Sequence, residues 1–260
     1  MRKMDDKSIA NMAVLAGEIM LRSGAETYRV EDTIKHILDT AGTAETESLV
    51  MLTGIIVTID RPGQEAVTVM RRVHDRGTNM HRIVEVNEIS RKYCAGDLSA
   101  EETWEKLKKI KGKQYTVWMY NLVTILVPAG FAPLFGGGLR EILAAGGAGI
   151  VLAVLMTIGK RVKTGAFILN ILCAAGIAVA AVFLKLWNPL LNMDTVIISG
   201  IMPLVPGVAI TNAIRDTLRG DYISGGARAL EAFVTAAAVA IGAGVGIAAM
   251  NVFWRGGGLL

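Results

Sequence analysis

The sequence has few of the residues that small secreted or metal-binding domains depend on. Only two cysteines occur in 260 residues, and Cys94 and Cys173 lie far apart and form no CxxC pair. Disulfide and zinc chemistry therefore have no support. The GxSxG, HExxH and GxxxxGK[ST] motifs of hydrolases, zinc proteases and ATP-binding proteins are also missing. We expect no enzymatic activity and no cofactor, and a membrane-tethered hydrolase is the weakest of the alternatives.

Charged residues become scarce in the second half of the chain. Residues 1–113 hold 18 Lys/Arg and 18 Asp/Glu, whereas residues 114–260 hold 9 and 5. A fall this sharp indicates a change of solvent from water to lipid. The net charge of +4 arises entirely in the second half. Its basic residues flank apolar runs, where they anchor helix ends to lipid headgroups, so nucleic acid is not an expected partner.

Five apolar runs in the second half are long enough to cross a bilayer. A lipid core about 30 Å thick needs roughly 20 apolar residues in a helix. The predicted spans cover residues of about 116–136, 142–159, 164–184, 195–214 and 232–254. We therefore predict a small cytoplasmic α+β domain over residues 1–113, followed by an all-α bundle of five transmembrane helices over residues 114–260. Gly242 and Gly246 form a GxxxG pair that allows close helix packing within this bundle.

The basic residues between the runs predict the orientation of the chain. Every second link is rich in Lys and Arg, and the links between them carry one basic residue each. The rich links contain Lys106, Lys108, Lys109, Lys111 and Lys113, then Lys160, Arg161 and Lys163, then Arg215, Arg219 and Arg228; the poor ones contain Arg140, Lys185 and Arg255. Since basic links stay in the cytoplasm, we expect a cytoplasmic N-terminus and an external C-terminus in the cell inner membrane.

The fourth run differs from the others because its centre contains Pro203, Pro206 and Gly207. Proline removes a backbone donor and clashes with the preceding turn, so two prolines followed by glycine predict an interrupted helix. Unpaired backbone groups at that depth are tolerated only against protein or a water-filled cavity. Transporters use the positive ends of such half-helices to hold anionic groups. A passive packing kink is the alternative.

Polar residues in and near the spans complete the predicted site. Asn212 and Asp216 share one helix face, and Arg215 is the candidate clamp for a substrate carboxylate. Asp216 is the candidate proton-titrating group. The alternative is a solvated link whose charges pair with one another.

Amides inside the spans add two candidates. Asn121 and Asn170 should face inward because unpaired amides are costly in lipid. Either amide could contact a substrate or could only join neighbouring helices by a hydrogen bond, and the sequence favours neither alternative.

The N-terminal part reads as a small α+β domain. Apolar periodicity predicts helices over 8–22, 80–93 and from 99 onward, and another that begins at a capping box of Ser23 and Glu26 and runs to about residue 40. β-branched residues predict a hairpin of 49–59 with 66–73, joined by the turn at 61–64.

Three strings resemble the threonine/serine exporter family. They are LAGEIMLRSGAETYRVEDTI (Leu15–Ile34), LTGIIVTID (Leu52–Asp60) and PLVPGVAITNAIRDTLRGDYISGGARALEA (Pro203–Ala232). The resemblance covers nearly the whole chain. It places Pro203, Pro206, Gly207, Asp216, Gly220, Asp221, Gly225, Arg228 and Glu231 on the family's motif. Asp216, Asp221, Arg228 and Glu231 are the residues we expect to couple or gate transport.

The resemblance also implies a partner. Full-length members carry a cytoplasmic domain and about ten spans, so this chain is similar to the larger subunit of the split form, which works with a second, short membrane subunit and in a higher oligomer. One such pair is associated with succinate. The implied function is a subunit of a secondary transporter that exports small carboxylates, either threonine/serine-like amino acids or succinate-like dicarboxylates. The alternative is a regulatory or scaffolding subunit whose partner holds the pathway.

Overall fold

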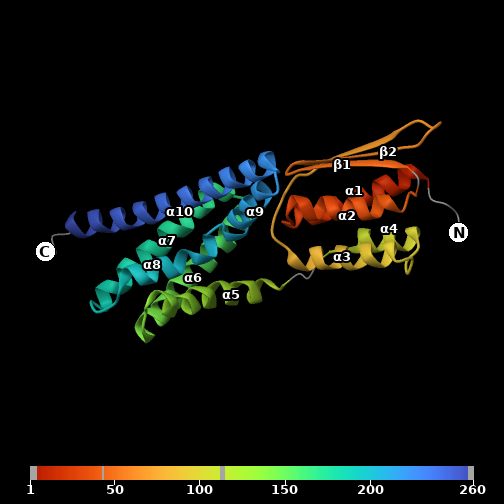
Figure 1. Ribbon diagram of the computed structural model, residues 1–260. Helices are drawn as coiled ribbons and strands as arrows, with labels where there is room; N and C mark the ends of the chain where they lie inside the picture. Colours follow the sequence, from red (N-terminus) through yellow and green to blue (C-terminus); the bar gives the residue numbers. More distant parts are fainter. Residues whose placement is uncertain (1–4, 43, 112–114, 257–260) are drawn as a thin grey trace. The chain divides into compact units, whose positions relative to one another are not determined.

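The computed structural model describes residues 5–42, 44–111 and 115–256, which form a mostly helical chain with one small sheet (Figure 1). The chain falls into two compact units. The first comprises Met1–Gln114 and Gly207–Leu230, and the second comprises Tyr115–Pro206 and Glu231–Leu260. The predicted domain boundary at 113/114 lies outside the described residues. The segment 207–230 packs with the first unit, although the sequence suggested placing it with the spans.

Helices and a sheet form three layers in the N-terminal part of the first unit (Figure 1). Helices α1 (Asp6–Arg22) and α2 (Thr27–Asp39) lie between the sheet on one side and α3 (Met80–Cys94) and α4 (Ala100–Lys109) on the other. The apolar face predicted for the first helix is buried in this core, with Met12, Ala13, Ala16 and Met20 fully inaccessible. The four predicted helices of this part correspond to α1, α2, α3 and α4 and are confirmed.

The sheet has three antiparallel strands in the order β1 (Glu45–Met51), β2 (Gly54–Asp60), β3 (Val67–Arg72). The predicted hairpin across residues 61–64 is confirmed as the β2–β3 pair. The prediction of a single strand over 49–59 was wrong. A tight turn at Leu52–Thr53 divides that stretch, so that Met51 pairs with Gly54. The apolar run hid the turn because neither residue is a typical turn former.

The predicted capping box at the start of α2 was also wrong. Glu26 is itself the residue preceding the helix, and its side chain makes no capping hydrogen bond. The Ser23 hydroxyl instead donates to the Ile19 carbonyl at 2.6 Å. A capping box does form at α4, where Ser99 and Glu102 bond each other's backbone.

The second unit contains α5 (Val117–Phe131), α6 (Leu139–Val162), α7 (Ala166–Trp187), α8 (Met193–Ile201) and the larger part of α10 (Tyr222–Gly256). Small residues such as Ala148, Ala174 and Ala178 are buried between the helices. Large apolar side chains, including Leu126 and Ile150, are more than half exposed. This distribution is typical of helices that pack through small residues and turn large ones toward lipid.

Four helices of the described chain are long and apolar enough to cross a membrane: Val117–Phe135, Leu139–Val162, Ala166–Trp187 and Tyr222–Phe253. A fifth candidate exists if Met193–Leu204 and Gly207–Leu218 are counted together as one interrupted span. These are the five predicted regions. The fourth of them along the chain, residues 195–214, counts as a span only if the two helices of the interrupted pair are taken together.

The GxxxG prediction is confirmed at the contact of α10 with α7. A Cβ at Gly242 would lie 2.3 Å from the Ile171 carbonyl oxygen, and one at Gly246 would lie 2.6 Å from that of Ala175. No real Cβ approaches backbone this closely, so both positions require glycine. Gly244, between them, faces open space.

This contrast predicts opposite effects of the same substitution. Gly244→Ala should stabilise the protein by up to about 1 kcal/mol because alanine favours the helix. Gly242→Ala should destabilise it, since the methyl group pushes α10 away from α7. The midpoint of thermal denaturation in detergent measures both. Equal shifts of the same sign would contradict this account of the helix contact.

Candidate functional site

The predicted interruption of the fourth run is confirmed. Helix α8 ends at Ile201, a single 3₁₀ turn covers Met202–Leu204, and Val205 adopts an extended conformation with φ −67° and ψ 128°. Helix α9 then begins at Gly207 and runs to Leu218. Pro203 lies in the 3₁₀ turn before the break, and Pro206 directly precedes α9. Proline has no backbone N–H to donate, so both positions suit a stretch where the helical hydrogen bonds are interrupted.

Helix α9 buries the face predicted from the four-residue spacing. Asn212 is 5% exposed and Asp216 is fully buried, while their neighbours Ile214 and Leu218 are exposed. The buried face contacts the turn between α1 and α2. We call Gly24–Thr27 the docking turn, and we call the four side chains that bind it the docking residues: Asn212, Arg215, Asp216 and Arg228.

The docking residues bind four consecutive positions of the docking turn. Asn212 Nδ2 donates to the Gly24 carbonyl at 2.9 Å. Arg228 Nη2 donates to the Ala25 carbonyl at 2.7 Å. Arg215 donates to the Glu26 carboxylate. Each docking residue therefore satisfies a backbone or side-chain group that the helical ladders of α1 and α2 leave unpaired.

Asp216 completes this set by capping α2. Its carboxylate accepts hydrogen bonds from the Thr27 amide and the Thr27 hydroxyl, both at 3.1 Å. Thr27 is the first residue of α2, so the carboxylate lies at the positive end of the helix dipole. A residue 189 positions away in the sequence thus supplies the cap that Glu26 does not.

Electrostatic pairing makes the burial of these charges possible. Arg228 Nε lies 2.9 Å from an Asp216 carboxylate oxygen, and both side chains are at most 7% exposed. Burial acts to raise the pKa of Glu26, but the hydrogen bond from Arg215 and the charges of Arg29 and Arg215 give a net lowering. Glu26 therefore forms a second ion pair at the docking turn, in which the carboxylate is buried while the Arg215 side chain is 55% exposed.

Two glycines of the predicted motif shape the connection between α9 and α10. Gly220 has φ +94°, a conformation that favours glycine, and it ends α9. A Cβ at Gly225 would lie 2.3 Å from the Thr217 hydroxyl and 3.0 Å from the Ala213 carbonyl oxygen. The first turn of α10 can therefore approach α9 closely enough for Arg228 to reach Asp216.

Two further predicted residues, Asp221 and Glu231, follow α9 in the sequence. Asp221 is partly buried, and its pKa is raised by burial and by the charge of Asp216. Glu231 begins the second unit's part of α10, and its carbonyl accepts from Thr235.

The two amides predicted to face inward belong to the second unit. Asn121 accepts a hydrogen bond at 3.2 Å from the Thr157 hydroxyl, which joins α5 to α6. Asn170 is partly buried on α7. Their contact with a substrate stays a prediction.

Sequence reasoning missed the docking turn itself. Thr27 was not singled out, and Glu26 was assigned to a cap that does not form. The only signal was the resemblance, because residues 24–27 lie in its first string and the docking residues lie in its third. No rule of spacing connects two segments about 190 positions apart.

The fold and the apolar helices define a multi-pass membrane protein with an additional polar α+β unit. The family model of the threonine/serine exporters (ThrE) matches residues 11–250. The chain belongs to this family, whose members are transporters.

Curated relatives cover most of the chain at low identity. It is 24% identical over 230 residues to "Probable succinate transporter subunit YjjP" of Escherichia coli, covering 88% of this chain and 89% of that protein. The YjjP of Klebsiella aerogenes is 26% identical over 242 residues, covering 92% and 93%. "Probable threonine/serine exporter" of Mycobacterium tuberculosis is 24% identical over 246 residues, covering 91% of this chain but 45% of that protein. No solved structure matches the chain.

The Asp216 contacts predict a matched pair of substitutions on α2. Thr27→Val leaves the buried carboxylate with one donor fewer and should cost about 1–3 kcal/mol. Thr33→Val, also buried, removes a hydroxyl that bonds the Arg29 carbonyl at 2.9 Å and lies 3.5 Å from the Asn87 amide oxygen; it should cost less because neither acceptor is charged. Thermal denaturation of the full chain in detergent compares them. Similar losses from both would contradict a special role for Thr27.

Proposed function

We propose that this protein is a subunit of a secondary transporter that exports small carboxylate metabolites. The observation that carries the proposal is the proline-bounded break at Val205 within an otherwise apolar helical run. Such a break places unpaired backbone groups where an anionic substrate can be bound in an aqueous cavity of a membrane protein. The named functions of the relatives support the same class, because succinate, threonine and serine all carry a carboxylate.

A partner chain is part of this proposal. The relatives that this chain matches along most of their length are named subunits, and the longer Mycobacterium tuberculosis relative is matched over 45% of its length. We propose a second membrane subunit and an assembly of several chains. A gradient of protons or another ion would drive export, since no ATP-binding motif is present in the sequence.

The docking residues have two possible roles in transport. We propose Pro203, Pro206, Gly207, Asn212, Arg215 and Asp216, with Asn121 and Asn170, as residues that shape or line the substrate path, and Asp216, Asp221, Arg228 and Glu231 as coupling or gating residues. The contacts of Asp216 with Thr27 and Arg228 favour a gating role for that carboxylate, because all three would have to separate before it could bind a proton or a substrate.

Flux measurements with the partner subunit present test the transport proposal. The double variant Pro203→Ala/Pro206→Ala restores two helical N–H groups and should abolish export while membrane insertion is retained. The control is Pro128→Ala, because α5 continues past Pro128 to Phe131 and contains no break to close. Export is measured as accumulation of succinate, threonine and serine in the medium.

The same experiment decides between transport and scaffolding. The alternative of a regulatory or scaffolding subunit is favoured by one observation, namely that the docking residues are occupied by the docking turn. Unaltered flux in the double proline variant would support scaffolding and refute the proposed path.

The orientation can be tested with the natural cysteines. We propose a cytoplasmic N-terminus and an external C-terminus in the inner membrane. Cys94 of the first unit is exposed and Cys173 is fully buried. Burial and the charge of Asp39 raise the pKa of the Cys94 thiol, so labelling should quicken as the pH rises above neutral.

A membrane-impermeant thiol reagent should therefore label inside-out vesicles and leave intact cells unlabelled. Cys94→Ser removes the signal and identifies the site. Labelling of intact cells at Cys94 would place the first unit outside and contradict the proposed orientation.

A further inference from the structure

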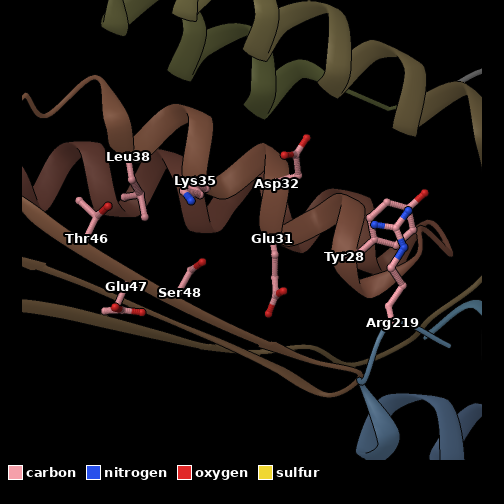
Figure 2. A pocket seen from close by; sticks show the side chains of 9 residues that line it. All are labelled: Tyr28, Glu31, Asp32, Lys35, Leu38, Thr46, Glu47, Ser48 and Arg219. Carbon is pink, nitrogen blue, oxygen red and sulfur yellow. The ribbon is translucent and has the colours of Figure 1, made fainter. Parts of the chain in front are cut away.

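A polar groove lies between α2 and β1 of the first unit, apart from the docking residues (Figure 2). Its cavity has a volume of about 580 Å³, within the range of small-molecule sites. We call it the α2–β1 groove. The lining residues that carry the argument are Tyr28, Glu31, Lys35, Thr46, Ser48 and Arg219.

Glu31 contributes a carboxylate to the lining of the groove. Its side chain extends from α2 toward the strands (Figure 2), and one carboxylate oxygen accepts from the Val50 amide at 3.1 Å. Burial raises the pKa of Glu31, and the charges of Asp221 and Asp216 add to the rise. The described residues provide no cation within 4.0 Å of this carboxylate. A cation bound beside Glu31 would offset the cost of burying its charge and its repulsion by Asp216 and Asp221.

Two cations line the same groove. Lys35 is one turn along α2 from Glu31, on the same side of the helix. Arg219 holds its guanidinium over the Tyr28 ring, 4.1 Å from the ring centre. In the described part of the chain neither cation forms an ion pair with a carboxylate. Opposite charges therefore line one cavity without neutralising each other.

Hydroxyl groups complete the lining. Thr46 and Ser48 alternate along β1 and are partly buried, and their side chains point toward α2 (Figure 2). Both can donate to or accept from a bound polar group. Asp32 and Glu47 also line the cavity, so that its carboxylates outnumber its cations. This balance disfavours a ligand with two negative charges.

We propose that the α2–β1 groove binds a small zwitterion of the α-amino-acid class, with the ligand ammonium on Glu31 and the ligand carboxylate on Lys35. Thr46 and Ser48 would bond the carboxylate end, and the Arg219–Tyr28 pair would close the other side of the groove. Because Tyr28 follows Thr27 and Arg219 lies three residues after Asp216, the ligand would bind beside the docking turn. In a role that rests on the transport function and orientation proposed above, the site would report the cytoplasmic concentration of an amino acid to the segment that follows the helix break.

Hydrogen exchange of the full chain in lipid nanodiscs, read by mass spectrometry, locates binding to this groove. L-threonine should slow exchange in peptides that contain residues 28–38 and 46–50. N-acetyl-L-threonine lacks the ammonium, L-threoninamide lacks the carboxylate, and succinate carries two carboxylates. None of these three should protect the groove at the same concentration.

Charge-removing variants show whether the two proposed contacts hold the ligand. Lys35→Gln and Glu31→Gln should each raise the threonine concentration for half-maximal protection about tenfold or more. Lys92→Gln is the matched control, since Lys92 is an exposed lysine of α3 that pairs with Glu88 away from the groove. Lys35 is itself exposed, so its replacement leaves the fold intact.

The outcomes separate this inference from the proposed function. Equal protection by succinate, no protection by threonine, or unchanged concentration dependence in both groove variants would each overturn the zwitterion site. Export is measured independently. If the unsubstituted protein and its partner subunit export none of the three carboxylates while threonine still protects the groove, the transport proposal alone is refuted. Normal export without groove protection would refute this site alone.

Discussion

The burial of one carboxylate constrains the first unit more than any other contact. Asp216 is fully inaccessible to solvent, and an uncompensated buried carboxylate costs several kcal/mol. Compensation comes from the amide and hydroxyl of Thr27, from the ion pair with Arg228 and from the dipole of α2. These partners come from α2 and α10, so the charge can be buried only when the docking turn and the segment 207–230 are held together.

This constraint explains why the docking residues belong to the first unit although apolar helices precede and follow them in the sequence. Asn212 and Arg228 donate to the carbonyls of Gly24 and Ala25, which are exposed by the end of α1. Gly225 lets α10 approach α9, and Gly220 lets the chain reverse between them. The residues that resembled a transport motif thus have a structural role in this unit, whatever chemical role they also have.

Composition and periodicity predicted the parts of the fold that depend on local chemistry. The absence of charge located the four long apolar helices, and Pro203, Pro206 and Gly207 located the break, because both signals act through the local backbone or the local solvent. The helices of the first unit were found for the same reason. The turn at Leu52–Thr53 and the start of α2 were missed because neither carries its usual residues. The pairing of β1 with β2 determines the position of the turn, and the cap from Asp216 determines where α2 begins.

The partners of the charged residues could not be predicted in the same way. The sequence shows that Arg215 and Asp216 are charged and adjacent to apolar residues. Such residues could form a substrate clamp or an internal ion pair, because both require the same residue types. What distinguishes them is the contact with residues 24–27, about 190 positions earlier, which no periodicity encodes. The relatives' names leave a similar ambiguity, because succinate and threonine share a carboxylate and differ in the charge at the other end. A carboxylate clamp alone cannot distinguish them, so discrimination requires a group such as Glu31 that attracts an ammonium and repels a second carboxylate.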